Sequence, residues 1–317
     1  MTHPGPTDAP SVTRCYQNHH LDSTRWEVYS PRAGDIIVTT AYKSGTTWTQ
    51  QILYQLLHGE TDPMPAFDAV TPWPDARFLP ITREALGPFM DAIPGRRFIK
   101  SHLPLDGLPY YPEVKYLIVG RDARDVFMSF FNHYSRYTDF AMSQFNAPDI
   151  VGAKLPRCPE DPRALWQQWI TRGWFDWESE GWPFWANLGH TASYWPWRGL
   201  PNFHFMHYND MLADLEGTVR SLCAFLGEAP SQAHLARIVE RTTFRNAKAE
   251  ALAADAGRGR KSMVFEGGAG GFFFKATNGR WRDVLTDADL ELYEQAKRRV
   301  LTPDCARWLE VGGPVPA

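Results

Sequence analysis

The amino-acid sequence predicts an α/β fold: a single domain in which helices flank a central parallel β-sheet. Two observations predict it. Four short apolar segments have the length and composition of buried strands, namely residues 35–40, 97–101, 114–120 and 203–208. Amphipathic helical patterns follow three of these segments, at residues 46–58, 123–137 and 210–226. Because strand, loop and helix recur in this order, helices should cover both faces of the sheet.

The domain is expected to span residues 14–317, after a flexible N-terminal tail of residues 1–13 that is rich in Pro, Thr and Gly. No internal repeat and no linker divides it. Two segments within it are unusual. Residues 160–200 hold eight of the 13 tryptophans and should be helical, with interruptions at Gly173, Gly181 and Pro183. Residues 247–271 are rich in Ala, Gly and charge, which is typical of a mobile loop or lid.

Composition and charge exclude several classes of protein. The formal net charge of −3 gives no basic field for nonspecific nucleic-acid binding, so no nucleic-acid partner is expected. The four cysteines are far apart and form no CxxC pair, which argues against a zinc site and a disulfide framework. The N-terminus has no signal-peptide pattern, and no apolar run approaches the roughly 18 residues of a membrane span. We expect a soluble, cytoplasmic protein without stable membrane association.

The loop after the first predicted strand has the chemistry of an anion site. Parallel sheets bind ligands at the carboxyl ends of their strands, and here residues 43–48 read KSGTTW. Gly45 permits a tight turn, the helix that follows presents unpaired N–H groups, and Lys43 adds a cation. The nucleoside-triphosphate pattern GxxxxGK[ST] is missing. A capped helix beside a solvated lysine is the alternative.

The second and third strand ends add a base and two cations. Lys100 and His102 alternate along a strand, so both side chains point to one face and can converge on one spot. The alternative for His102 is a structural histidine. Arg121 offers a planar fork for a phosphate, and Ser129 lies on the second turn of the following helix. The alternative for Arg121 is an ion pair with a neighbouring aspartate.

The last two segments are weaker signals. After the fourth strand, Tyr208 is either a core residue or an adenine contact, and Asp210 is an ordinary helix cap. Near the C-terminus, Lys275, Gly279 and Arg280 place cations and a flexible turn beside an aromatic residue. This segment either closes over a phosphate or forms a basic surface loop.

Taken in order, five strings resemble the cytosolic sulfotransferases that use 3′-phosphoadenosine 5′-phosphosulfate (PAPS). The strings are AYKSGTTW, KSHLP, GRDARDVFMSFFNHY, HYNDM and FFFKATNGRW, and the match spans residues 35 to about 290. The resemblance implies a P-loop-like phosphosulfate-binding loop after the first core strand. It further implies that PAPS, or its product adenosine 3′,5′-bisphosphate (PAP), contacts Lys43, Ser44, Gly45, Thr46, Thr47, Trp48, Arg121, Ser129, Tyr208, Thr242, Phe244, Lys275 and Gly279.

The resemblance also implies a reaction. His102 is the general base for an acceptor hydroxyl that attacks sulfur in line, while Lys43 and Lys100 stabilise the developing charge without a metal. One motif departs from the family pattern RKGxxGxW, because Phe274 and Ala276 replace an arginine and a glycine. Cations that could compensate in the 3′-phosphate clamp are Arg258, Arg260, Lys261, Arg280 and Arg282. The KxxxTVxxxE dimerisation string is missing, so both a monomer and a homodimer are open.

The acceptor is predicted only as a class. Aromatic side chains of residues 166–197, with Phe130, Phe131 and Tyr137, could wall an apolar cavity. A small hydroxyl compound such as a phenol, sterol, alcohol or lipid is therefore favoured over a polar sugar. Two alternatives to the enzyme are a metal-dependent P-loop kinase or NTPase and a noncatalytic nucleotide-binding homologue.

Overall fold

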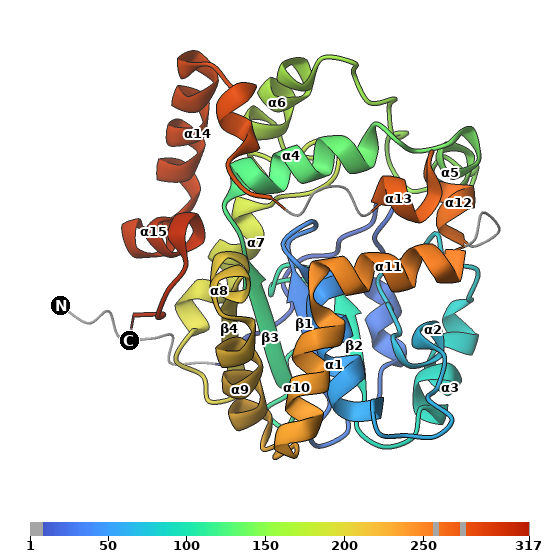
Figure 1. Cartoon of the computed structure of the whole chain (residues 1–317). Helices are drawn as coiled ribbons and strands as arrows, with labels where there is room; N and C mark the ends of the chain where they lie inside the picture. The colour runs from blue at the N-terminus through green and yellow to red at the C-terminus, as the bar shows by residue number, and fades with distance from the viewer. Residues whose placement is uncertain (1–8, 256–259, 273–276, 317) are drawn as a thin grey trace.

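A four-stranded parallel sheet forms the centre of the protein. The computed structural model describes residues 9–255, 260–272 and 277–316 (Figure 1). The strands lie in the order β2-β1-β3-β4, and every neighbouring pair is parallel. Their bounds are β1 Ile36–Thr40, β2 Phe98–Ser101, β3 Lys115–Gly120 and β4 Phe203–His207. The predicted α/β fold and its four strands are thus confirmed, each strand end within one residue.

Alternation along the strands explains why helices cover both faces. Successive side chains of a strand point to opposite sides, and all five residues of β1 are buried. Ile36 and Val38 belong to one apolar cluster, whereas Ile37 belongs to the other. Helices α1, α9 and α10 pack over the first face, and α4, α6 and α7 lie on the second (Figure 1).

The helices and 3-10 turns of the described chain are η1 Ser23–Val28, α1 Thr46–His58, α2 Phe67–Val70, α3 Arg83–Ala92, α4 Ala123–Tyr134, α5 Asp139–Phe145, α6 Pro162–Thr171, α7 Leu188–Tyr194, η2 Trp195–Trp197, α8 Tyr208–Ala213, α9 Leu215–Leu226, α10 Gln232–Thr242, α11 Phe244–Asp255, α12 Arg260–Val264, α13 Gly268–Phe272, η3 Arg280–Asp283, α14 Asp287–Val300 and α15 Pro303–Val311. None of these helices is long and apolar enough to cross a membrane.

Of the three predicted helices, α1 has the expected bounds and α4 ends three residues early. The helix expected over residues 210–226 is wrong as a single element, because the chain forms α8 and α9 with a break at Asp214. The Asp214 side chain accepts a hydrogen bond of 2.8 Å from the backbone N–H of Gly217 and so caps α9. Aspartate favours such capping over a place inside a helix.

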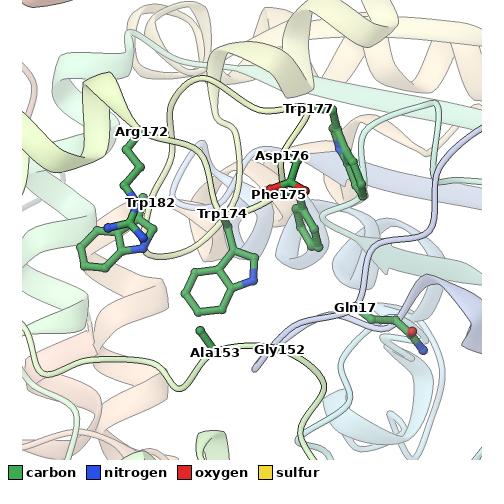
Figure 2. Close-up of a pocket in the computed structure, with 9 residues that line it drawn as sticks. All are labelled: Gln17, Gly152, Ala153, Arg172, Trp174, Phe175, Asp176, Trp177 and Trp182. Atoms are coloured by element: carbon green, nitrogen blue, oxygen red, sulfur yellow. The ribbon is translucent and has the colours of Figure 1, made fainter.

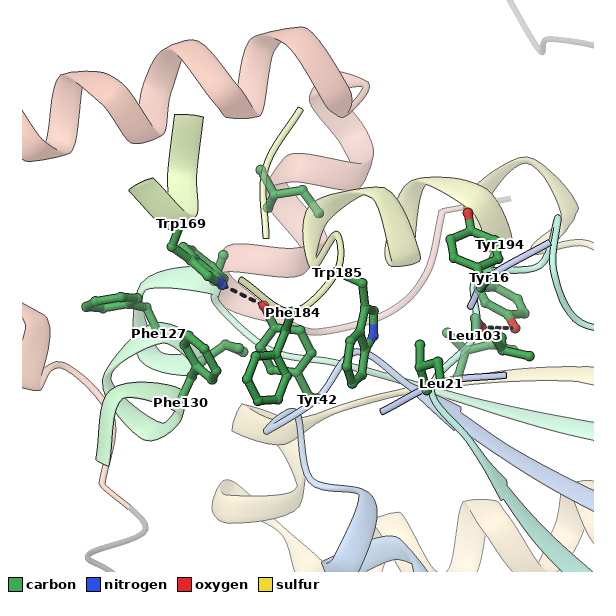
Figure 3. Close-up of a cluster of buried hydrophobic side chains, with 14 of the residues drawn as sticks. Tyr16, Leu21, Tyr42, Leu103, Phe127, Phe130, Trp169, Phe184, Trp185 and Tyr194 are labelled. Atoms are coloured by element: carbon green, nitrogen blue, oxygen red, sulfur yellow. Dashed lines mark hydrogen bonds between the residues drawn. The ribbon is translucent and has the colours of Figure 1, made fainter. Parts of the chain in front are cut away.

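The tryptophan-rich segment forms α6, an irregular stretch over residues 172–187, and then α7 and η2. The predicted interruptions at Gly173, Gly181 and Pro183 all fall in the irregular stretch. Four of its eight tryptophans are buried in the larger apolar cluster: Trp166, Trp169, Trp185 and Trp195. Figure 3 shows Trp169 donating a hydrogen bond of 2.5 Å to the Tyr42 hydroxyl, which joins this segment to the loop after β1.

The loop expected over residues 247–271 is corrected by the structure. Within the described residues, most of this segment is helical, in α11, α12 and α13. Alanine is the strongest helix former, and the alanine-rich sequence from residue 247 to 255 therefore continues a helix that begins at Phe244. The mobility of this segment stays a prediction. Residues 1–8 of the expected N-terminal tail lie outside the described residues.

Candidate active site

The loop that follows β1 joins the sheet to α1 in a strained conformation. Lys43 has φ +64°, and Gly45, which precedes the helix, has φ +116°. The hydroxyls of Thr40 and Thr46 lie 2.5 Å apart and tie the strand end to the helix start. A side chain at Gly45 would meet Tyr208 at 3.1 Å, so the loop rests against the end of β4. The first-turn N–H groups of α1 are thereby aimed beyond the sheet.

His102 is held in one tautomer beside this loop. Its Nδ1 lies 2.8 Å from the carbonyl oxygen of Thr40, which can only accept, so Nδ1 carries the proton. The other ring nitrogen, Nε2, therefore keeps its lone pair. Burial lowers the pKa of His102 well below its usual value, and the charge of Lys100 acts in the same direction. A neutral imidazole with an available Nε2 is the form that a general base requires.

Lys43 and Lys100 approach the same region from the loop after β1 and from β2. The Lys100 ammonium lies 3.4 Å from the ring centroid of Trp73, and that ring is 5.2 Å from the ring of His102. Lys43 Nζ lies 3.3 Å from His133 Nδ1. Burial, and next the charge of Arg121, lower the pKa of Lys43 to about 7. The structure thus brings together the three predicted catalytic residues, and the charges of both lysines act on His102.

Arg121 is a buried cation whose hydrogen bonds go to neutral oxygens. Its Nη1 donates to the Lys43 carbonyl oxygen at 3.0 Å, and its Nε and Nη2 donate to Asn278 Oδ1 at 3.2 and 2.7 Å. The guanidinium lies 4.0 Å from the ring centroid of Tyr208. Burial lowers the pKa of Arg121. A buried guanidinium with neutral partners suits an anionic ligand, because a bound phosphate would supply the opposite charge.

One face of α4 meets the C-terminal segment next to Arg121. Asp125 accepts a hydrogen bond of 2.6 Å from the backbone N–H of Gly279, and Ser129 and His133 follow at four-residue spacing on the same face. Gly279 has φ +84°, which explains a glycine at this turn. The charge of Arg280 lowers the pKa of Arg121, which places these two cations close together.

Several predicted contacts of the 3′-phosphate clamp are not described. Lys275, Phe274, Ala276 and Arg258 lie outside the described residues, as does the side chain of Arg260. Among the remaining candidates, Arg282 lies 4.4 Å from the ring centroid of Trp281. Arg280, which follows Gly279 and whose charge acts on Arg121, is a candidate replacement for the missing arginine. Asn278 was not predicted, since an asparagine within a loop carries no motif of its own.

The predicted adenine contacts come together beside the first turn of α1. The indole Nε1 of Trp48 donates to the Thr242 carbonyl oxygen at 2.7 Å, and the rings of Trp48 and Tyr208 lie 5.5 Å apart at 72°. Phe244 begins α11 two residues after Thr242. Aromatic faces beside a row of cations and helix N–H groups fit an adenine nucleotide that carries phosphate groups.

A separate hollow of about 260 Å³ lies within the tryptophan-rich segment (Figure 2). None of the predicted catalytic or nucleotide-binding residues lines it. Its lining residues are Gln17, Gly152, Ala153, Arg172, Trp174, Phe175, Asp176, Trp177 and Trp182. Among the described residues, no group of three or more His, Cys, Asp or Glu side chains is arranged to hold a metal ion.

The fold and the site together define an α/β enzyme that binds an anionic adenine nucleotide at the carboxyl ends of its strands. Residues 33–302 match the family model described as a sulfotransferase domain. The chain therefore belongs to the sulfotransferase family. The prediction of a PAPS-dependent sulfotransferase that acts on a small hydroxyl compound is confirmed, and with it the sulfuryl donor.

Curated relatives span nearly the whole chain. A glycolipid sulfotransferase of Mycobacterium tuberculosis is 29% identical over 318 residues and covers 94% of both chains. Sulfotransferase 2B1 of Homo sapiens is 28% identical and covers 84% of this chain and 66% of its own length.

Solved structures share the fold. Mouse sulfotransferase SULT7A1 complexed with PAP has a TM-score of 0.64 at 19% identity, covering 90% of each chain. Retinol dehydratase in complex with androsterone and PAP has a TM-score of 0.64 at 22% identity, covering 86% of this chain and 82% of its own.

Proposed function

We propose that this sulfotransferase acts on a hydroxyl group attached to a lipid or another apolar body, with His102 as the general base. The observation that carries the proposal is the fixed tautomer of His102: its Nδ1 proton is held by the Thr40 carbonyl oxygen, so Nε2 is the basic atom. This nitrogen belongs to a buried, neutral ring beside two lysines.

Residue roles follow from these positions. His102 Nε2 takes the proton of the acceptor hydroxyl while the hydroxyl oxygen forms its bond to sulfur. The bond between sulfur and the bridging oxygen of the 5′-phosphate breaks, and negative charge moves onto that oxygen. Lys43 and Lys100 stabilise this charge, and they are effective because the site is buried.

In the proposal, residues that follow β1, β3 and β4 hold the nucleotide, together with residues of α4, α10, α11 and the segment around η3. The N–H groups and hydroxyls of Ser44, Gly45, Thr46 and Thr47 bind the 5′-phosphosulfate. Arg121, Ser129 and Arg280 bind the 3′-phosphate, with Lys275 and Gly279 in the same segment. Trp48, Tyr208, Thr242 and Phe244 hold the adenine. The burial of Arg121 among neutral oxygens and its proximity to Arg280 support the second group.

The surroundings of His102 support an apolar acceptor. The ring of Trp73 lies 5.2 Å from His102 and the ring of Trp185 lies 6.1 Å away. The mycobacterial relatives are named glycolipid sulfotransferases and cover 94% of the chain. A hydroxyl of a lipid or glycolipid is therefore the acceptor that we propose. The four cysteines are free, which supports a cytoplasmic location, and we propose a monomer or homodimer.

The first prediction concerns His102. Replacing it by alanine removes the base while the lysines remain, so kcat for sulfation of 1-octanol or 4-nitrophenol should fall about 10²- to 10⁴-fold. The assay measures transfer of label from [³⁵S]PAPS, and PAP affinity should change little.

A matched control is His204→Ala, which removes a half-buried histidine that stacks on Phe225 away from the site. The control should keep its activity. Equal activity of His102→Ala and the wild-type enzyme would contradict the role of His102 as base.

A further inference from the structure

A pair of adjacent buried histidines, His19 and His20, lies near the active site and has no role in the mechanism above. The ring of His20 is 5.2 Å from Phe78 and 6.0 Å from Trp185, and Trp185 in turn faces His102. The charge of Lys100 acts on His20, which places it within electrostatic reach of the catalytic groups. Both histidines are almost fully buried.

Hydrogen bonds fix the protons of this pair. His19 Nε2 lies 2.7 Å from the carbonyl oxygen of Pro183 and must donate to it, so His19 Nδ1 keeps a lone pair. The Nδ1 atoms of His19 and His20 are hydrogen-bonded to each other, and His20 Nδ1 is therefore the donor. This leaves His20 Nε2 as an acceptor. Burial lowers the pKa of both rings, which keeps them neutral and preserves this assignment of donors and acceptors.

The chain of hydrogen bonds ends on Tyr137. Its hydroxyl lies 3.3 Å from His20 Nε2, and because that nitrogen only accepts, the Tyr137 proton is directed at His20. The phenol oxygen then keeps its lone pairs, and no other described residue donates a hydrogen bond to it. A buried oxygen with unused lone pairs is ready to accept from a ligand.

Tyr137 is close to the reacting groups. Its ring is 5.2 Å from that of His133, and His133 Nδ1 is 3.3 Å from Lys43 Nζ. The ring of Phe145 lies 4.9 Å from Tyr137 and 3.9 Å from His20, so aromatic side chains surround the polar chain. A single acceptor oxygen within an aromatic wall discriminates between ligands by the donor that they bring to it.

We propose that Tyr137 is a specificity residue that accepts a hydrogen bond from a second hydroxyl of the acceptor, and that His19 and His20 position it. This inference rests on the proposed function. It narrows the acceptor to a compound with a lipid part and at least two hydroxyls, such as an alkyl glycoside. It also revises the expectation from the sequence, which favours an apolar hydroxyl compound over a sugar. The lipid part would contact the aromatic wall.

The test compares two ligands with the same alkyl chain, octyl β-glucoside and 1-octanol. Their dissociation constants are measured by calorimetry on the full-length protein saturated with PAP, so no turnover is required. Wild-type protein should bind the glucoside more tightly. Tyr137→Phe should lose about tenfold or more of affinity for the glucoside and little for octanol, because one buried hydrogen bond is removed.

The matched control is Tyr134→Phe. Tyr134 is the last residue of α4, three residues before Tyr137. It is also buried, and it donates its hydroxyl hydrogen to the Pro156 carbonyl oxygen. Its loss should not change the ratio of the two affinities. His20→Phe keeps the stacking on Phe145 but frees the Tyr137 proton, and it should reduce the ratio while PAP affinity is unchanged.

The outcomes separate this inference from the proposed function. If the wild-type protein does not prefer the glucoside, or if Tyr137→Phe and Tyr134→Phe change the ratio equally, the inference is wrong. If the preference depends on Tyr137 but His102→Ala sulfates both acceptors as fast as the wild type, the proposed catalytic role fails and the specificity role stands.

Discussion

At the scale of single residues, the site brings together cations whose charge suits an anionic ligand. Lys43 illustrates this, because burial and Arg121 lower its pKa to about 7. Below that pH the ammonium is charged in the free protein, and above it the amine is mostly neutral. A bound nucleotide favours the charged form and raises the pKa again. Binding above pH 7 must therefore take up a proton.

This gives a prediction for pH dependence. PAP affinity should fall as the pH rises above about 7, by up to tenfold per pH unit, because the proton bound by Lys43 becomes scarcer. Lys43→Met should bind PAP more weakly and lose most of this slope. The measurement is calorimetric titration with PAP at pH 6.5, 7.5 and 8.5.

The control for this experiment is Lys115→Met, since the Lys115 ammonium lies over the Phe225 ring, far along the sheet from the loop. It should keep the wild-type slope. A wild-type affinity that is constant from pH 6.5 to 8.5 would show that Lys43 does not titrate in this range.

Residues were predictable where a strand end and a motif coincided. His102 and Arg121 directly follow β2 and β3, and Lys43 lies three residues after β1. Parallel strands bring their carboxyl ends together. Asn278 and His133 were not predicted, because their roles depend on long-range contacts: Asn278 with Arg121, and His133 with Lys43. Sequence spacing does not report such contacts.

At the scale of elements, the start of α1 depends on the backbone of Gly45. Its φ of +116° is unfavourable for any other residue, and an added Cβ would press on Tyr208 at 3.1 Å. Tyr208 in turn lies 4.0 Å from the Arg121 guanidinium. Strain at Gly45 would therefore reach both the 5′ and the 3′ ends of the nucleotide site.

Gly45→Ala should thus weaken PAP binding by at least tenfold, corresponding to about 1.4 kcal/mol. The loss should exceed what the change in thermal stability explains. The matched control is Gly227→Ala, which has φ +74° at the end of α9 and open space around its Cβ position. It should lower stability by about 1 kcal/mol and leave PAP affinity unchanged. Equal PAP affinities for both variants would contradict the prediction.

Elements differ in how well the sequence predicts them. Strands are short apolar runs buried on both faces, so composition alone identifies them, as for β1 and β3. The content of Ala, Gly and charge over residues 247–271 predicts a mobile loop or lid, yet the alanines at its start extend α11. The break at Asp214 depends on a side-chain cap within a continuous apolar pattern, which a hydrophobic period cannot reveal.

At the scale of the whole molecule, the carboxyl ends and the amino ends of the strands differ in function. We call these two sides of the sheet its carboxyl edge and its amino edge. The carboxyl edge carries the reacting groups, and several of them are strained or desolvated. The amino edge carries a buried ion pair between Arg97 and Asp35, which precede β2 and β1. Arg97 also donates to the carbonyl oxygens of Met90 at 3.2 Å and Ser30 at 2.7 Å. Tyr29 donates to the same Asp35 carboxylate at 2.7 Å.

Because the reacting groups and the buried ion pair lie at opposite ends of the strands, stability and nucleotide binding should be separable by mutation. Arg97→Met leaves the Asp35 carboxylate buried without its cation, so the free energy of unfolding should fall by about 3–5 kcal/mol. PAP affinity at 15 °C, where the variant is still folded, should remain within about twofold of wild type, because no contact of the nucleotide site is lost. A tenfold loss of affinity would require a change of about 1.4 kcal/mol in the binding free energy.

The control is Arg83→Met, which breaks the exposed ion pair with Glu27 and should cost less than about 1 kcal/mol. Urea unfolding measures the stabilities, and calorimetry measures PAP binding. A large loss of PAP affinity in folded Arg97→Met would mean that the amino edge also sets the geometry of the loop after β1. The strand register supports an unchanged PAP affinity. Ile36 and Phe98 pair in parallel next to the ion pair, and four further residues of β1 separate this pair from Ala41, where the loop begins.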